Sequence, residues 1–128
     1  DHWITSDHNA SGDSSSLGML VAAQKAQFTA YCAAGYTTQV STTTLSDNVW
    51  YHLVGTYDGA NSRLYVNGVQ EDSDAQTCTL FNSVTAASIG RPGAYTSAIS
   101  FNGQIDDVRV WNRALSATEV MVLYQSYR

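Results

Sequence analysis

Residues 50–69 show the clearest alternation of apolar and polar positions in the chain, and aromatic and β-branched side chains recur there. Alternation with a period of two predicts β-strands. Residues 58–62 have the composition of a loop, because Gly, Asn and Asp tolerate positive φ at low cost. Asn67-Gly68 predicts a type I′ turn, in which both central residues need positive φ. We therefore expect an antiparallel meander with strands at 50–57 and 63–66.

Shorter strand-like stretches lie on both sides of this meander and are separated by polar loops. The longest loop is 6–16, and a second one covers 94–100. The acidic run at 71–74 is interpreted as a set of solvated turn residues, since runs of charge are usually exposed. We predict further strands at 1–5, 17–21, 26–34, 37–44, 77–80, 87–90 and 104–111.

A helix signal stands near the end of the chain. Ser116 and Glu119 have the spacing of a capping box, in which each side chain accepts a hydrogen bond from the backbone amide of the other residue. Leu115 and Val120 occupy the positions of a hydrophobic staple. An apolar stripe follows at i, i+3 and i+4. We expect a short helix of about two turns that plugs one end of a β-sandwich.

Two blocks of sequence stand out, WYHLVGTYDGANSRLYVNGV at 50–69 and FNGQIDDVRVWNRALS at 101–116. Both resemble the laminin G-like, concanavalin A-like jelly-roll family of lectins and glucanases. The resemblance implies an all-β fold, an antiparallel two-sheet jelly-roll sandwich with one short C-terminal helix. It also implies that 1–128 is a single domain that lacks the first family strands. Such an open sheet edge invites a homodimer.

The bulk composition narrows the class of protein. The 128 residues have room for one domain. Only 13% of them are charged, against about 25% in typical domains. A net charge of −5 with six Lys plus Arg argues against nucleic acid and anionic membrane surfaces as partners. A polar, weakly charged surface of this kind suits a secreted or cell-surface module.

Two cysteines, Cys32 and Cys78, are not spaced as a zinc or redox motif. Their neighbours suggest that both side chains point inward. The sequence leaves open whether they form a disulfide or stay as two buried thiols, because spacing does not give the Cα separation.

Catalytic carboxylates are sparse. Retaining glycoside hydrolysis needs two carboxyl groups about 5 Å apart, and the chain has only two glutamates, Glu71 and Glu119. The Glu119 carboxylate is expected in the helix cap. His52 is expected to be packed rather than to act as a base. We therefore expect no enzyme, and a glucanase-like hydrolase is the least favoured alternative.

Calcium is possible, but no cofactor is required. Members of the resembling family bind Ca²⁺ at the sandwich edge, and hard cations take oxygen ligands. Asp106 is the first candidate, because it shares strand parity with Val108 and Val110 and a buried charge needs a partner. A hydrogen-bonded Asp106 is the other interpretation. Asp58 and Asn61 are secondary metal candidates.

Aromatic side chains offer a second kind of site, because sugar rings stack on Trp and Tyr. Trp50 and Tyr65 are expected in the core. Trp111 and Tyr95 are expected at the surface. The predicted ligand-binding residues are Trp111, Tyr95, Arg109 and Asn112. The expected function is a non-catalytic, lectin-like module for a carbohydrate or glycoprotein, and the alternative is a protein-interaction or adhesion module.

Overall fold

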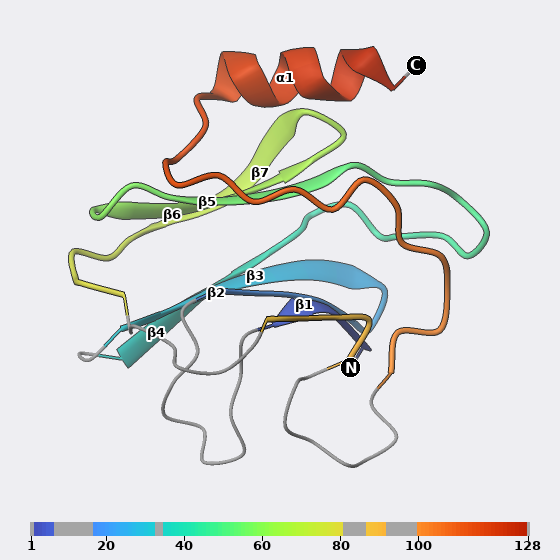
Figure 1. The fold of residues 1–128 in the computed structure, drawn as a ribbon, viewed down its shortest axis with the longest axis horizontal. Coiled ribbons are helices and arrows are strands. Elements are labelled where there is room, and N and C mark those ends of the chain that lie inside the picture. The colour runs from blue at the N-terminus through green and yellow to red at the C-terminus, as the bar shows by residue number, and fades with distance from the viewer. Residues whose placement is uncertain (1, 7–16, 33–34, 81–86, 92–99, 128) are drawn as a thin grey trace.

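The computed structural model describes residues 2–6, 17–32, 35–80, 87–91 and 100–127. Two antiparallel sheets stack face to face, and a helix covers the smaller one (Figure 1). The larger sheet has the order β4-β3-β2-β1-β8, and the smaller has the order β5-β6-β7. The strands are β1 (His2–Ser6), β2 (Leu17–Ala22), β3 (Lys25–Cys32), β4 (Gly35–Val40), β5 (Leu53–Tyr57), β6 (Asn61–Val66), β7 (Val69–Ala75) and β8 (Ser88–Ile89), and the helix is α1 (Ala117–Ser126). The predicted jelly-roll class of fold is confirmed.

The smaller sheet is the predicted meander. Its second turn is a two-residue hairpin in which Val66 pairs with Val69. Asn67 and Gly68 take φ values of 50° and 83°, as a type I′ turn requires. The acidic residues that follow belong to β7, so they do not form the predicted turn.

Between the sheets lies the main core. Met19, Ala26 and Phe28 of the larger sheet pack against Leu64 and Val66 of the smaller one. Inward-facing side chains of both sheets supply this core, because alternate residues of a strand point to opposite faces.

The outer face of the smaller sheet carries a second core under α1. Tyr65, Leu115 and Val120 are buried together, and Val54 and Leu123 pack against them. Leu115 and Val120 are the two staple residues, so the predicted staple forms. The prediction that the helix plugs one end of the sandwich was wrong. The apolar stripe of α1 packs against Tyr65, so the helix lies over the outer face of the smaller sheet (Figure 1).

One side of the sandwich is closed by side chains, which we call the polar seam. On β7, Asp72 accepts a hydrogen bond from the Val40 amide at 2.8 Å, and Asp74 accepts one from Gln39 Nε2 at 3.1 Å. Glu71 accepts from the Thr43 amide at 2.8 Å and from the Thr43 hydroxyl. These carboxylates bind β4 and the chain after it. Glu71 and Asp72 are half-buried, which differs from the prediction of solvated side chains, whereas Asp74 is exposed as predicted.

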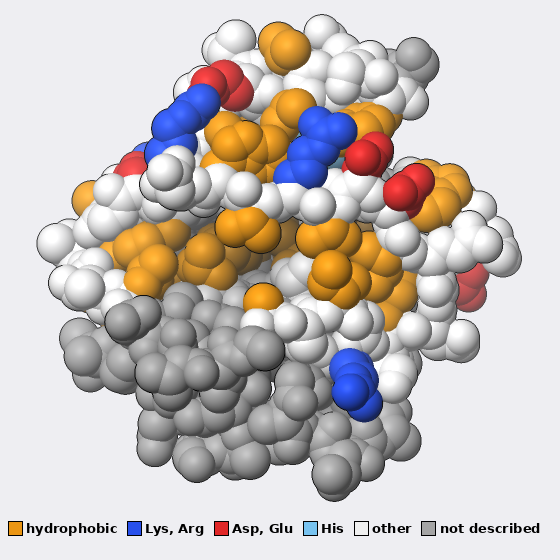
Figure 2. Space-filling model, in the orientation of Figure 1, with side chains coloured by type: hydrophobic (Ala, Val, Ile, Leu, Met, Phe, Trp, Pro, Cys, Tyr) orange, Lys and Arg blue, Asp and Glu red, His pale blue; other side chains and the backbone are white. Residues whose placement is uncertain are grey.

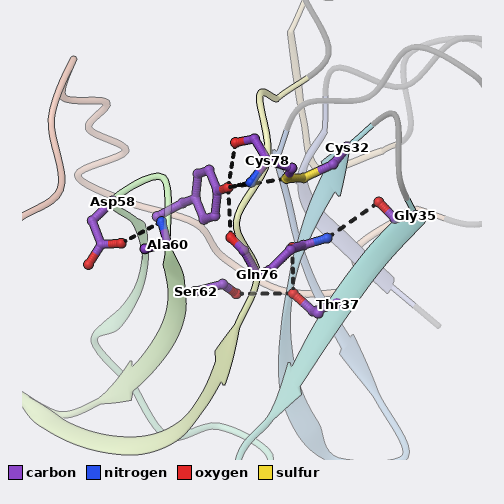
Figure 3. Close-up of a disulfide and its surroundings, with 9 residues drawn as sticks. Cys32, Gly35, Thr37, Asp58, Ala60, Ser62, Gln76 and Cys78 are labelled. Atoms are coloured by element: carbon purple, nitrogen blue, oxygen red, sulfur yellow. Dashed lines mark hydrogen bonds between the residues drawn. A yellow bond between two sulfur atoms is a disulfide. The ribbon is translucent and has the colours of Figure 1, made fainter.

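A disulfide between Cys32 and Cys78 joins the end of β3 to the chain that follows β7 (Figure 3). Tyr57 Oη donates to the Cys78 carbonyl at 2.7 Å, and the Gln76 side chain accepts from Thr37 Oγ1 at 2.7 Å. The disulfide, together with the hydrogen bond between Thr37 and Gln76, connects the two sheets beside the polar seam. The disulfide was one of the two interpretations that the sequence left open.

The predicted strand at 104–111 is absent, since no sheet pairing covers these residues. Asp107 takes a φ of 50°, and this left-handed conformation interrupts the extended chain that a strand needs. Asp106, Val108 and Val110 are consequently exposed. The expectation of a buried Asp106 was wrong.

Trp50 was also wrongly placed in the core, because 63% of its surface is exposed. Strand β5 begins only at Leu53, so Trp50 lies in the connection that follows Asn48, a residue with a φ of 61°. Tyr65, in contrast, is 2% exposed, as predicted.

Within the described residues no helix is long and apolar enough to span a membrane. The homodimer through an open edge stays a prediction.

Candidate functional site

The chain that enters α1 is fixed by a network around Glu119. The Glu119 carboxylate accepts hydrogen bonds from the Ser116 amide at 2.8 Å and from Ser116 Oγ at 2.9 Å. Ser116 Oγ in turn accepts from the Glu119 amide, which completes the predicted capping box. Arg113 donates to both oxygens of the same carboxylate, at 3.0 and 2.6 Å. These bonds, with that from Arg113 first, lower the pKa of Glu119 to about 2.

A shallow groove lies between this chain and α1, and we call it the Trp111 groove. Its volume is about 280 Å³. Trp111, Leu115, Val122 and Leu123 give it an apolar lining, whereas Thr118 and the Arg113–Glu119 pair supply its polar groups. Trp111 is 39% exposed. Figure 2 shows hydrophobic side chains gathered below the helix on this face, with charged side chains beside them.

A second groove, here called the ion-pair groove, lies on the other side of the same chain. It has a volume of about 500 Å³ and is lined by Asp58, Arg63, Gln70, Arg113 and Glu119 among others. Arg63 Nη1 donates to Asp58 Oδ2 at 2.6 Å, and the Ala60 and Asn61 amides donate to Asp58 Oδ1. The hydrogen bond from Arg63, followed by those from the two amides, lowers the pKa of Asp58 to about 2.

His52 forms an aromatic cluster with Tyr124 of α1 and with Tyr127, which directly follows the helix. The His52 ring centroid lies 6.0 Å from that of Tyr124 and 5.5 Å from that of Tyr127, and the Arg109 guanidinium carbon lies 5.6 Å from the Tyr127 centroid. Burial and, to a lesser extent, the charge of Arg109 lower the pKa of His52. Nδ1 of His52 is buried without a hydrogen-bond partner in the described part of the chain. The cluster therefore anchors the end of α1 and favours a neutral imidazole.

The structure separates the predicted ligand-binding residues. Trp111 lines a groove, as a stacking residue must. Arg109 instead lies over Tyr127 and pairs with Asp107 at 3.3 Å. Asn112 is exposed next to Trp111 and lines neither groove. Tyr95 lies outside the described residues.

The metal candidates fall on two different segments. Asp58 and Asn61 flank the turn between β5 and β6, where the Asp58 carboxylate already binds Arg63. Asp106 is exposed, and its carboxylate accepts the Asp107 amide at 2.8 Å. Across the described ranges no group of three or more His, Cys, Asp or Glu side chains could hold a metal ion. Calcium binding at these residues stays a prediction.

Sequence reasoning missed most of the polar groups in the two grooves. Arg63, Gln70 and Thr118 were not singled out, and Glu119 was considered only as a cap. Arg113 and Glu119 are six residues apart, so neither the i, i+3 nor the i, i+4 spacing marks them as a pair. Arg63 reaches the same region only because α1 folds back over the meander. The capping box and the surface Trp111 were the local signals that pointed to this place.

Comparison with known proteins gives two findings. Residues 2–121 match a family model described as the concanavalin A-like lectin/glucanases superfamily. Among solved structures, the chain is similar to residues 221–444 of an S-layer domain-containing protein from Clostridium thermocellum ATCC 27405, with a TM-score of 0.57 and 23% identity. That match covers 91% of this chain and 59% of the other. Because the identity is only 23%, the likeness concerns the fold alone. No curated protein matches the chain.

Proposed function

The chain belongs to the concanavalin A-like lectin/glucanases superfamily, and from this premise we propose that it is a non-catalytic carbohydrate-binding module of a secreted or cell-surface protein. Family and fold together fit a binding module. Fold alone does not decide the ligand, because one fold carries many activities. The choice of a carbohydrate therefore rests on the chemistry of the Trp111 groove.

The Trp111 groove is the observation that carries the proposal. A partly exposed indole stands beside a guanidinium, a carboxylate and the Thr118 hydroxyl. An aromatic face packs against the C–H face of a sugar ring, while charged and hydroxyl groups exchange hydrogen bonds with its hydroxyls. An apolar floor with a few convergent polar groups is typical of small-molecule sites. The groove offers both kinds of contact within one short stretch of chain.

Location at the cell surface has two supports. The solved structure with a similar fold comes from a protein described as S-layer domain-containing. The Cys32–Cys78 disulfide suits an oxidising environment, where such bridges persist.

The engagement of the two glutamates favours binding over hydrolysis. Glu71 lies on β7 and bonds to Thr43 across the polar seam. Glu119 lies in the first turn of α1, and its low pKa is the opposite of what a general acid needs. The two glutamates thus serve separate structural roles on separate elements.

A protein-interaction or adhesion module is the second candidate. Trp50 and Val110 are 63% and 90% exposed, and exposed apolar side chains are common where proteins meet. This candidate predicts a protein partner and no response to glycans.

A glycan array probed with the labelled domain tests the proposal. We expect some glycans to bind, with dissociation constants in the micromolar to millimolar range, or roughly −4 to −8 kcal/mol. Release of reducing sugar from the same polysaccharides should stay at the level of the buffer. An array without any bound glycan would overturn the proposal, and release of sugar would restore the glucanase interpretation.

A further inference from the structure

The two grooves beside α1 adjoin each other, because they share part of their lining. Arg113, Leu115 and Glu119 line both of them. The Arg113–Glu119 pair therefore lies at the junction, with Trp111 on one side and the Arg63–Asp58 pair on the other. The Trp111 groove alone is just below the volume of roughly 300–1,000 Å³ that is usual for ligand sites. The two adjoining grooves, of about 280 and 500 Å³, together have room for more than one sugar ring.

The charges along this surface are balanced. Each of two guanidinium groups pairs with one carboxylate, and both ion pairs have an N–O distance of 2.6 Å. Asp58 and Glu119 each have a pKa of about 2, so both carboxyl groups stay ionised at neutral pH. Because each positive charge is already neutralised, a uronate or sulfate group would meet no net positive charge here and would be repelled by the neighbouring carboxylate.

A neutral sugar can use the same pairs without breaking them. A hydroxyl group is both donor and acceptor, whereas a guanidinium only donates and an ionised carboxylate only accepts. Asp58 engages Arg63 through Nη1, and a guanidinium carries five N–H donors in all. Gln70 adds an amide, which offers both a donor and an acceptor, on the same surface.

We propose that the ligand is a neutral oligosaccharide that spans both grooves, with one ring on Trp111 and the next units along the two ion pairs. This inference rests on the proposed carbohydrate-binding function and names its ligand class. Each added unit gains hydrogen bonds to Arg63, Asp58 or Gln70. We expect affinity to rise about tenfold from a monosaccharide to a tetrasaccharide, because each net hydrogen bond contributes modestly.

Calorimetric titration with oligosaccharides of increasing length tests the ligand class. The probes are gluco-, manno- and xylo-oligosaccharides from mono- to tetrasaccharide, and oligogalacturonates of the same lengths. The double variant Asp58→Asn/Arg63→Gln removes one ion pair and leaves the net charge of the groove unchanged. The matched control is Arg91→Gln, at an exposed arginine outside both grooves. We expect the double variant to bind monosaccharides like the wild type and to lose the gain with length. The control should keep that gain.

The inference fails if the double variant keeps the full gain with length, or if oligogalacturonates bind more tightly than neutral oligosaccharides. In both cases sugar binding itself survives, so the proposed function stands. If no sugar of any length binds, the proposed function fails together with the inference.

Discussion

Gly55 of β5 packs directly against the ring of Phe28, which lies on β3 of the other sheet. A Cβ atom at this position would overlap the ring of Phe28. Close-packed interiors transmit such an overlap as strain, since they hold few voids. The side chain of Phe28 thus takes the space that any larger residue at position 55 would need.

We predict that Gly55→Ala lowers the free energy of unfolding by about 1–3 kcal/mol, which is the usual cost of overpacking a core. Urea denaturation measures the change. The double variant Gly55→Ala/Phe28→Leu should recover part of the loss, because the shorter side chain clears the space. An unchanged midpoint for Gly55→Ala would contradict this packing.

His52 makes the stability sensitive to mildly acidic pH. Burial, with the charge of Arg109, holds its folded-state pKa below the usual histidine value of about 6.5, so the unfolded chain binds a proton first as the pH falls. The free energy of unfolding is then highest above the unfolded pKa and decreases as the pH falls toward the folded pKa.

We expect the melting temperature to fall between pH ~7.5 and ~5.5, and His52→Phe to reduce this slope, because Phe cannot titrate. Melting curves across this range measure both. A slope that is the same in wild type and variant would show that His52 is not the group responsible.

At the scale of elements, the polar seam takes the place of a sheet ladder between β4 and β7. Burial works to raise the pKa of Glu71, but hydrogen bonds from Thr43 and Thr42 outweigh it and lower the pKa. The contacts of Glu71 in the seam are therefore strongest when its carboxyl group is ionised.

We predict that Glu71→Ala costs about 1–2 kcal/mol of unfolding free energy at neutral pH, since it leaves two donors of Thr43 without an acceptor. Because the folded pKa of Glu71 is lowered, this contribution is present above its unfolded value and is lost as the pH falls through the folded one. Ser73→Ala, at an exposed position on the same strand, is the matched control. Equal midpoints in urea for both variants would argue against the seam.

Local signals explain which elements the sequence could predict. The turn at Asn67-Gly68 and the capping box at Ser116 depend on a few neighbouring residues, and both were correct. The stretch 104–111 alternates like a strand, but a left-handed Asp107 leaves no mark in that pattern. Of the predicted ligand-binding residues, only Trp111 lines a groove. Arg63 of the ion-pair groove was missed, because it comes from a distant strand that folding brings nearby.

The whole molecule has three layers, two sheets and a helix, and one covalent link joins the sheets. Cys32 ends β3 of the larger sheet, and Cys78 follows β7 of the smaller one. The sequence separation of 46 residues makes the closed loop long. A long closed loop removes much entropy from the unfolded chain.

We predict that reduction of this disulfide lowers the free energy of unfolding by about 4 kcal/mol on the chain-entropy model. Guanidinium denaturation with and without reductant measures the loss. The variant Cys32→Ser/Cys78→Ser should show the lower midpoint in both conditions. A wild-type midpoint that does not move after complete reduction would refute this role.

The Trp111 groove is the central claim, and calorimetric titration of Trp111→Ala with the strongest glycan from the array tests it most directly. Trp50→Ala is the matched control, because Trp50 is exposed but lines neither groove. Its loss should change unfolding free energy by only about 0.5 kcal/mol. A melting curve should show that Trp111→Ala is folded. Trp111→Ala should weaken binding by about tenfold or more, whereas Trp50→Ala should bind like the wild type. Equal affinity of Trp111→Ala and wild type, or equal losses in the two variants, would contradict the account.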